Sequence, residues 1–202
     1  MVDFNSVRFI DHTKQEIEIK AKTILTSIGS ELPIDVDFII EKSGLDIYPM
    51  VGLKRNSGID AYLALDKKTI YYDPDVFVPR MRFSLAHEFG HYVLHKELIE
   101  SSHISDVTEW KSFVERFPEW MRFKIEGHAD EFAGQLLVPK EKIIEVIPEF
   151  SSQLTEVKDH GITDIDLINN SLSKLMCINF NVSNGTMWKR LKNEGINPLD
   201  YI

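Results

Sequence analysis

The sequence contains almost no cysteine and no long hydrophobic run, and each absence excludes a class of protein. Cys177 is the single cysteine among 202 residues, so no disulfide can form within the chain and a reducing compartment is expected. No apolar stretch reaches the ~20 residues of a membrane span. The N-terminal residues are mixed polar and lack the apolar core of a secretory signal. We therefore expect a cytoplasmic protein that does not enter a membrane.

Positive charge is also scarce. The chain has 23 Lys and Arg residues against 32 Asp and Glu residues, a net charge of −9, which argues against broad binding of nucleic-acid phosphates by the whole chain. Hydrophobic content of 43% and charged content of 27% are those of an ordinary globular protein. The length suits one domain with a small appendage. We expect a core over residues 1–160 and a C-terminal helical unit over residues 161–202, packed on that core.

Hydrophobic periodicity predicts an α+β fold with a small sheet among helices. The expected strands are residues 46–51, 59–65 and 69–72, the last two joined as a hairpin. The expected helices are residues 6–29, 33–44, 79–96, 117–137, 140–147 and 149–160. Residues 97–116 are polar and without a regular pattern, so we expect a surface excursion there. The strand at 59–65 is either an internal strand or an edge that can pair with an extended substrate.

The last forty residues resemble a helix-turn-helix, because two helical stretches are joined by a tight turn. Thr163 or Asp164 can cap the first helix, which runs to about Asn179, and Ser183 can cap the second, which runs to Lys192. The segment is locally basic. Its cations are Lys174, Lys189, Arg190 and Lys192. Apolar side chains interleave with these cations, so simple packing on the core is an equal alternative to DNA binding.

The central motif is His87-Glu88-Phe89-Gly90-His91, which matches His-Glu-x-x-His. On a helix, residues four apart lie one turn above each other on the same face, so His87 and His91 can hold one metal ion. Glu88 can lean over the same ion and take a proton from its bound water. The alternative is a helix that merely carries two core or surface histidines. Gly90 inside this helix indicates that another group approaches the helix backbone closely.

A catalytic zinc needs a third protein ligand, and the helix at 117–137 must supply it. Glu126 is the preferred ligand, and Asp130, one turn on, can accept the free ring N–H of a ligand histidine. The small residues of this helix are expected to let it pack closely on the first. They are Gly127, Ala129, Ala133 and Gly134. Rival ligands stay open. They are His95, His128, Glu115, Glu119 and Glu131.

Two longer motifs carry a family resemblance. Residues 82–95 read Arg-Phe-Ser-Leu-Ala-His-Glu-Phe-Gly-His-Tyr-Val-Leu-His, and residues 126–139 follow Glu-x-x-Ala-Asp-x-Phe-Ala-x-x-Leu-Leu-Val-Pro. Together they resemble the active-site helix and the second motif of the ImmA/IrrE family of metallo-endopeptidases. The resemblance extends from about residue 30 to residue 195. Two features depart from the family pattern: Asp130 stands where Asn is common, and the excursion at 97–125 is longer than usual.

The resemblance implies a zincin-like proteinase core with zinc as the cofactor, manganese being the alternative for a mixed His and carboxylate site. Members of the family cut helix-turn-helix repressors and so switch on mobile-element or stress genes. The implied partner is a repressor encoded nearby. An oxyanion helper is often needed, and the candidates in this sequence are Tyr72, Tyr92 and His128. The rival function is a metal-containing regulator that binds DNA or protein without cutting it.

Overall fold

The computed structural model describes residues 9–64, 66–101 and 117–202, and within them the chain is mostly helical with one small sheet. This is the α+β composition expected from the sequence. No helix within the described ranges combines the length and the apolar character that crossing a membrane requires. The buried apolar side chains form one continuous cluster that extends from Ile17 to Ile196, so the N-terminal and C-terminal helices share a core.

The first two helices begin at side-chain caps. Helix α1 (Lys14–Ile28) starts after Thr13, whose side chain accepts a hydrogen bond from the Glu16 amide while Glu16 accepts one from the Thr13 amide. This capping box explains why the helix begins later than the expected residue 6; residues 1–8 lie outside the described ranges. Helix α2 (Val36–Lys42) starts after Asp35, which caps the Phe38 amide.

The sheet has three strands in the order β1-β3-β2. Strand β1 (Asp46–Pro49) is parallel to β3 (Thr69–Tyr72), and β2 (Ala61–Leu63) is antiparallel to β3, as the expected hairpin requires. A short helix that the pattern did not predict, α3 (Leu53–Ser57), connects β1 to β2. Because β3 lies in the middle, β2 is an edge strand.

Two long helices form the centre of the molecule. Helix α4 (Val78–Ser101) carries the His-Glu-x-x-His motif, and α6 (Glu119–Leu137) packs against it. They approach closely at Gly90, where an added Cβ would lie 3.2 Å from the Ala129 Cα and 3.1 Å from the Phe132 ring. The expected close approach at Gly90 is therefore confirmed. Helix α4 also continues through residues 97–101, where an irregular segment was expected; residues 102–116 lie outside the described ranges.

The small residues of α6 serve different contacts. A Cβ on Gly127 would meet nothing within 4 Å, so this glycine is not required for packing. A Cβ on Gly134 would lie 2.9 Å from the Cδ atom of Arg190, a side chain of the C-terminal helices. Only part of the small-residue stripe therefore faces α4. Gly134 instead leaves space for the aliphatic part of the Arg190 side chain.

The C-terminal third is a group of short helices. In order they are α7 (Lys140–Val146), the 3-10 turn Ile147–Phe150, α8 (Ser151–Asp159), α9 (Ile165–Phe180), α10 (Asn184–Asn193) and the 3-10 turn Pro198–Tyr201. Of the two expected caps for α9, Asp164 is the one used, and Ser183 caps α10 as expected. Asn181 adopts a left-handed conformation with φ 49° and turns the chain from α9 into α10.

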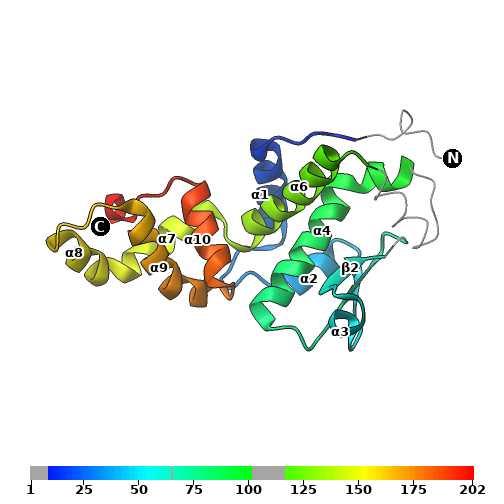
Figure 1. The fold of residues 1–202 in the computed structure, drawn as a ribbon, viewed down its shortest axis with the longest axis horizontal. Helices are drawn as coiled ribbons and strands as arrows, with labels where there is room; N and C mark the ends of the chain where they lie inside the picture. Colours follow the sequence, from blue (N-terminus) through cyan, green and yellow to red (C-terminus); the bar gives the residue numbers. More distant parts are fainter. Residues whose placement is uncertain (1–8, 65, 102–116) are drawn as a thin grey trace.

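The elements form an elongated molecule in which the sheet and the C-terminal helices lie at opposite ends (Figure 1). The sheet lies on one side of α4 and α6 on another, and α1 packs against α6. Helix α10 contacts both α9 and α6. The arrangement puts α6 between the motif helix and the C-terminal group, so its side chains reach both.

Candidate metal centre

The two histidines of the motif face each other on α4. His87 and His91 are one helical turn apart, and their Nε2 atoms lie 3.1 Å from each other. Both side chains are largely buried, with 17% and 16% of their surface exposed. Helix geometry alone brings these two nitrogen atoms together, as the spacing predicts.

Helix α6 brings a carboxylate to the same point. Glu126 Oε2 lies 3.3 Å from His87 Nε2, and Glu126 Oε1 lies 3.8 Å from His91 Nε2. Within the described ranges this is the one group of three or more His, Cys, Asp or Glu side chains whose ligand atoms all lie within 4.8 Å of one another. The rival ligands among the described residues do not enter it, and Glu115 lies outside the described ranges.

The donor chemistry of the group fits a divalent cation. His87 Nδ1 lies 3.0 Å from Asp130 Oδ1, so Nδ1 carries the hydrogen and a neutral His87 turns the lone pair of Nε2 towards His91 and Glu126. Metal–ligand distances of about 2.0–2.2 Å in a tetrahedral site place ligand atoms roughly 3.4 Å apart, close to the distances found. Two imidazole nitrogens and one carboxylate oxygen suit zinc and leave a fourth position for water.

The same acceptors attract a proton when no cation neutralises them. Burial opposes a charge on His87, but hydrogen bonds to Asp130 and Glu126 outweigh it and raise the pKa of His87 to about 10. The hydrogen bond from His87 in turn lowers the pKa of Glu126. Burial lowers the pKa of His91 to about 3. The carboxylates beside His87 therefore favour a cation at this place, either a proton on His87 or a divalent metal ion.

Glu88 lies beside this group but points to the sheet. Its Oε2 accepts a hydrogen bond of 2.8 Å from the Leu63 amide of β2. The neighbouring Ala64 amide bonds to Thr69 in β3, so alternation along the strand turns the Leu63 amide to the outer edge of β2. Burial raises the pKa of Glu88 to about 7. A carboxylate with that pKa can both take and return a proton near neutral pH.

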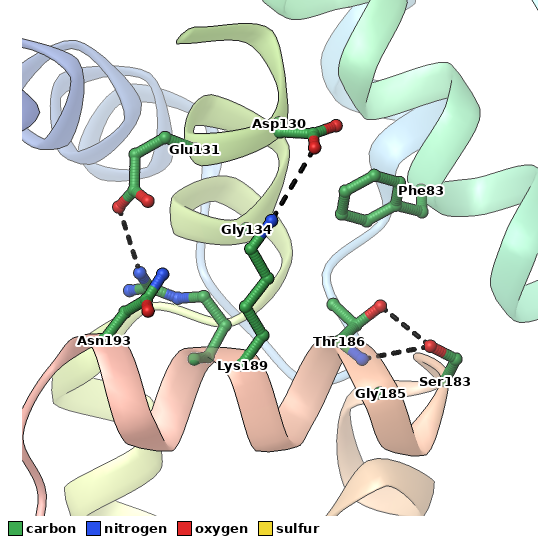
Figure 2. Close-up of a pocket in the computed structure, with 10 residues that line it drawn as sticks. Phe83, Asp130, Glu131, Gly134, Ser183, Gly185, Thr186, Lys189 and Asn193 are labelled. Atoms are coloured by element: carbon green, nitrogen blue, oxygen red, sulfur yellow. Dashed lines mark hydrogen bonds and ion pairs between the residues drawn. The ribbon is translucent and has the colours of Figure 1, made fainter. Parts of the chain in front are cut away.

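Asp130 links the centre to the C-terminal helices. Its Oδ1 contacts His87, while its Oδ2 lies 3.6 Å from the Nζ atom of Lys189 on α10. Figure 2 shows Lys189 directed at Asp130 across a cavity of about 320 Å³ between α6 and α10. Ser183 and Thr186 bond to each other at the start of α10, on another wall of this cavity (Figure 2).

The three predicted oxyanion helpers occupy different surroundings. Tyr92 stacks on Phe89 with ring centroids 6.1 Å apart, and the Lys96 Nζ atom lies over the Tyr92 ring, 5.4 Å from its centroid. Tyr72 packs against the hydrophobic core. His128 is turned towards His95, with its Nδ1 atom 3.4 Å from His95 Nε2. None of these contacts selects a helper, so that role stays a prediction.

Two contacts at the site were not anticipated from the sequence. The Leu63 amide holds Glu88, and His95 lies 3.0 Å from His91 through the Nδ1 atoms of both rings. The sequence contains no signal for the first, since a backbone amide has no residue type. The spacing of four between His91 and His95 signals the second, although it suggested a rival ligand rather than a partner. Burial lowers the pKa of His95 to about 3, so this ring is neutral.

Comparison with models of protein families places most of the described core in a known family. Residues 40–161 match the family model Peptidase_M78, described as the IrrE N-terminal-like domain. The matched stretch is more than half of the chain and contains the sheet, α4 and α6. A search of curated proteins finds no match.

Proposed function

Since this chain belongs to the M78 peptidase family of IrrE N-terminal-like domains, a family of metallopeptidases, we propose that it is a zinc-dependent endopeptidase. The reaction is hydrolysis of a peptide bond within a protein substrate. The observation that carries the proposal is the convergence of two imidazole nitrogens and one carboxylate oxygen within 4.8 Å of one another. We propose a zincin-like core for residues 1–160 and a C-terminal helical unit, residues 161–202, that packs on it.

In this proposal, His87, His91 and Glu126 hold the cation, and Asp130 fixes the tautomer of His87. When bound, the cation supplies Lewis acidity to water and to the substrate carbonyl. Glu88 accepts the proton of the attacking water and delivers it to the leaving amine. Support for this role comes from the Leu63 amide, which holds the Glu88 carboxylate at 2.8 Å, and from the burial that raises the pKa of Glu88 to about 7.

The outer edge of β2 is the proposed place of the substrate backbone. Strand β2 is at the edge of the sheet, and its outward Leu63 amide is directed at Glu88. An extended peptide added to this edge would run beside the catalytic carboxylate, and its backbone would gain hydrogen bonds from the strand. The edge favours an unfolded or loop segment as the cleaved sequence.

The proposed substrate is a helix-turn-helix repressor encoded nearby, whose cleavage would derepress mobile-element or stress genes in the cytoplasm. The support is the resemblance of both motifs to the ImmA/IrrE endopeptidases. The helix pair α9 and α10 resembles a helix-turn-helix itself, through the tight turn at Asn181 and the Ser183 cap.

The rival function, a DNA-binding regulator, gains little from the C-terminal unit. Arg190 has 3% of its surface exposed and pairs with Glu131 and Glu194. Lys189 pairs with Asp130, and Lys192 pairs with Asp166. Three of the four cations that made this segment basic are therefore neutralised by carboxylates, which leaves little charge for phosphates.

The proposal is tested by measuring the cleavage rate and the zinc content of the Glu88→Gln variant. The protein is incubated with a neighbouring repressor and with a peptide library, and mass spectrometry identifies new termini. We expect Glu88→Gln to lower the cleavage rate by about 10²–10⁴-fold while zinc content stays equimolar. Glu41→Gln, an exposed site on α2, controls for the loss of one negative charge and should cleave like the wild type.

Cleavage by Glu88→Gln at the wild-type rate would remove Glu88 from its role. Cleavage of the peptide library but not of the repressor would retain the endopeptidase and reject the substrate. An inactive wild-type protein that binds DNA in a salt-dependent way would favour the regulator.

A further inference from the structure

A row of imidazoles leads away from the proposed metal centre. His91 Nδ1 lies 3.0 Å from His95 Nδ1, and His95 Nε2 lies 3.4 Å from His128 Nδ1. At the far end, His128 Nε2 lies 3.4 Å from Asp11 Oδ1. The row therefore connects the His91 ring to a carboxylate through two further rings, and nitrogen atoms form each contact between rings.

Three separate parts of the chain build this row. His91 and His95 are one turn apart on α4, His128 comes from α6, and Asp11 precedes α1. His95 and His128 have only 3% and 8% of their surface exposed. The N-terminal segment covers them: Phe9 stacks on His128 with ring centroids 6.1 Å apart. Buried polar rings need partners, and the row supplies one on each side of His95.

Hydrogen placement along the row has a single consistent solution. A metal ion on His91 Nε2 leaves the hydrogen on His91 Nδ1, so His95 Nδ1 must accept it. The hydrogen of the neutral His95 ring is then on Nε2, where it points to His128 Nδ1. The hydrogen of His128 is in turn on Nε2, where it meets Asp11, which can only accept. Each of the three rings donates once, all in the same direction, and His95 and His128 each also accept once.

From this geometry we propose that His95, supported by His128 and Asp11, is the positioning residue of His91. The three residues hold His91 in the tautomer and orientation that a metal ligand needs, as Asp130 does directly for His87. Partners that accept the free N–H of a ligating histidine fix its tautomer and raise its basicity. The proposal rests on the proposed metal role of His91. Asp11 and Phe9 precede the matched residues 40–161, so this support comes from a part of the chain outside the family match.

The effect of each member should fall along the row. His95 contacts the ligand itself at 3.0 Å, whereas His128 and Asp11 act through contacts of 3.4 Å, which are long for hydrogen bonds. We therefore expect the loss of metal affinity to be largest for a change at His95, smaller at His128 and smallest at Asp11. A side chain that only fills space would produce no such gradient.

The first experiment compares two replacements of His95 in the full-length protein. The zinc dissociation constant is measured by competition with a chelator. His95→Phe fills the space but cannot accept the His91 N–H, and we expect the constant to rise by about 10–100-fold. His95→Gln can accept through its amide oxygen and donate through its amide nitrogen, so it should recover most of the affinity. Thermal unfolding of each variant reports any loss of packing separately.

The second experiment uses Asp11 with a matched control. Asp11 also pairs with Lys124, so Asp11→Asn and Lys124→Gln both remove that ion pair from the surface. Only Asp11→Asn replaces the charged carboxylate that receives the His128 hydrogen by a neutral and weaker acceptor. We expect Asp11→Asn to raise the zinc dissociation constant several-fold. This is less than the roughly 10–100-fold effect of partners that contact a metal ligand directly. Lys124→Gln should leave the constant unchanged.

Equal affinity losses in His95→Phe and His95→Gln would overturn the proposal, because packing alone would then explain them. Equal constants for Asp11→Asn and Lys124→Gln would remove Asp11 from the row. His91→Ala is measured alongside. A wild-type protein that binds no zinc, or His91→Ala that binds it normally, would overturn the metal centre together with the row. Full zinc binding with no effect at His95 would overturn the row alone.

Discussion

Helix α6 contributes to two polar clusters that differ in their balance of donors and acceptors. The first is the metal cluster, formed by His87, His91 and Glu126. The second, which we call the Arg190 cluster, joins Arg190 of α10 to Glu131, Gln135 and Glu194. Both connect α6 to another helix and both contain side chains that are largely buried, although Glu126 of the metal cluster is 61% exposed. The presence of buried polar side chains alone would therefore not tell the two clusters apart.

In the Arg190 cluster, hydrogen-bond donors are matched by acceptors. The Arg190 guanidinium donates to the Val138 carbonyl, to Glu131, to Gln135 and to Glu194, at distances of 2.9–3.2 Å. In the metal cluster, three acceptor atoms converge and need a cation. A saturated cluster of this kind holds helices together, whereas converging lone pairs create a binding site. Unmet acceptors, rather than buried polar groups as such, therefore mark the functional part of α6.

The largest effect that tests this contrast is loss of metal. His87→Ala removes one of the converging acceptors, so we expect it to lose equimolar zinc, measured by metal analysis after gel filtration. Arg190→Met, at the other cluster, should retain zinc at the wild-type ratio. Zinc retained by His87→Ala would mean that the two clusters do not differ in the way proposed.

The next effect is on stability. Arg190→Met removes the buried cation that pairs with both Glu131 and Glu194, whose side chains are 18% and 5% exposed. Breaking a buried ion pair costs about 3–5 kcal/mol of unfolding free energy, which urea denaturation can measure. Lys189→Met on the same helix removes an exposed pair and should cost less than about 1 kcal/mol. Equal losses in the two variants would contradict the structural role of the Arg190 cluster.

A smaller effect concerns the spacing of α4 and α6. Gly90→Ala places a Cβ 3.2 Å from the Ala129 backbone, so we expect about 1–3 kcal/mol of destabilisation and weaker zinc binding, because Glu126 moves with α6. Gly127→Ala enters open space and should stabilise the helix by about 0.5–1 kcal/mol. Calorimetry and zinc titration of the two variants test this. A stabilised Gly90→Ala variant would show that the space between α4 and α6 accommodates a methyl group at this position.

The smallest effect is a change in the pH dependence of stability. Burial opposes ionisation of Glu194, but the hydrogen bond from Lys14 and the charge of Arg190 outweigh it and lower the pKa of Glu194. A lowered pKa stabilises the folded state above the ordinary Glu value of about 4.3, and this contribution is lost as the pH falls through the folded-state pKa. Glu194→Gln should therefore differ from the wild type at pH 6 and converge with it near pH 3, measured by urea denaturation. If the unfolding free energies of the two proteins ran parallel over this pH range, Glu194 would not be the cause of the pH dependence.

Local spacing made the metal cluster predictable. His87 and His91, and likewise Glu126 and Asp130, are four residues apart, so helix geometry sets which face they share. The meeting of the two helices was then inferred from small residues, of which Gly90 and Ala129 lie against each other. The three strands were also anticipated, because β-branched and aromatic residues mark them.

Contacts between distant segments were not predictable. Arg190 was expected among exposed basic side chains, yet it is buried because Gly134 and three polar partners of α6 and α10 receive it. The short helix α3 was missed because Lys54 and its polar neighbours give no apolar stripe. The Leu63 amide that holds Glu88 has no counterpart in the sequence pattern at all. Such contacts depend on tertiary packing and not on local preference.

The composition of the Arg190 cluster also sets the order in which the protein can be completed during its synthesis. Lys14, Glu131 and Glu194 meet there from near the two ends and the middle of the chain. Every proposed catalytic side chain leaves the ribosome before Arg190 does. A nascent chain that has not yet reached α10 would possess the whole proposed catalytic set while Glu131 and Gln135 lacked the Arg190 guanidinium, so this end of α6 would gain its partners only after α10 is synthesised.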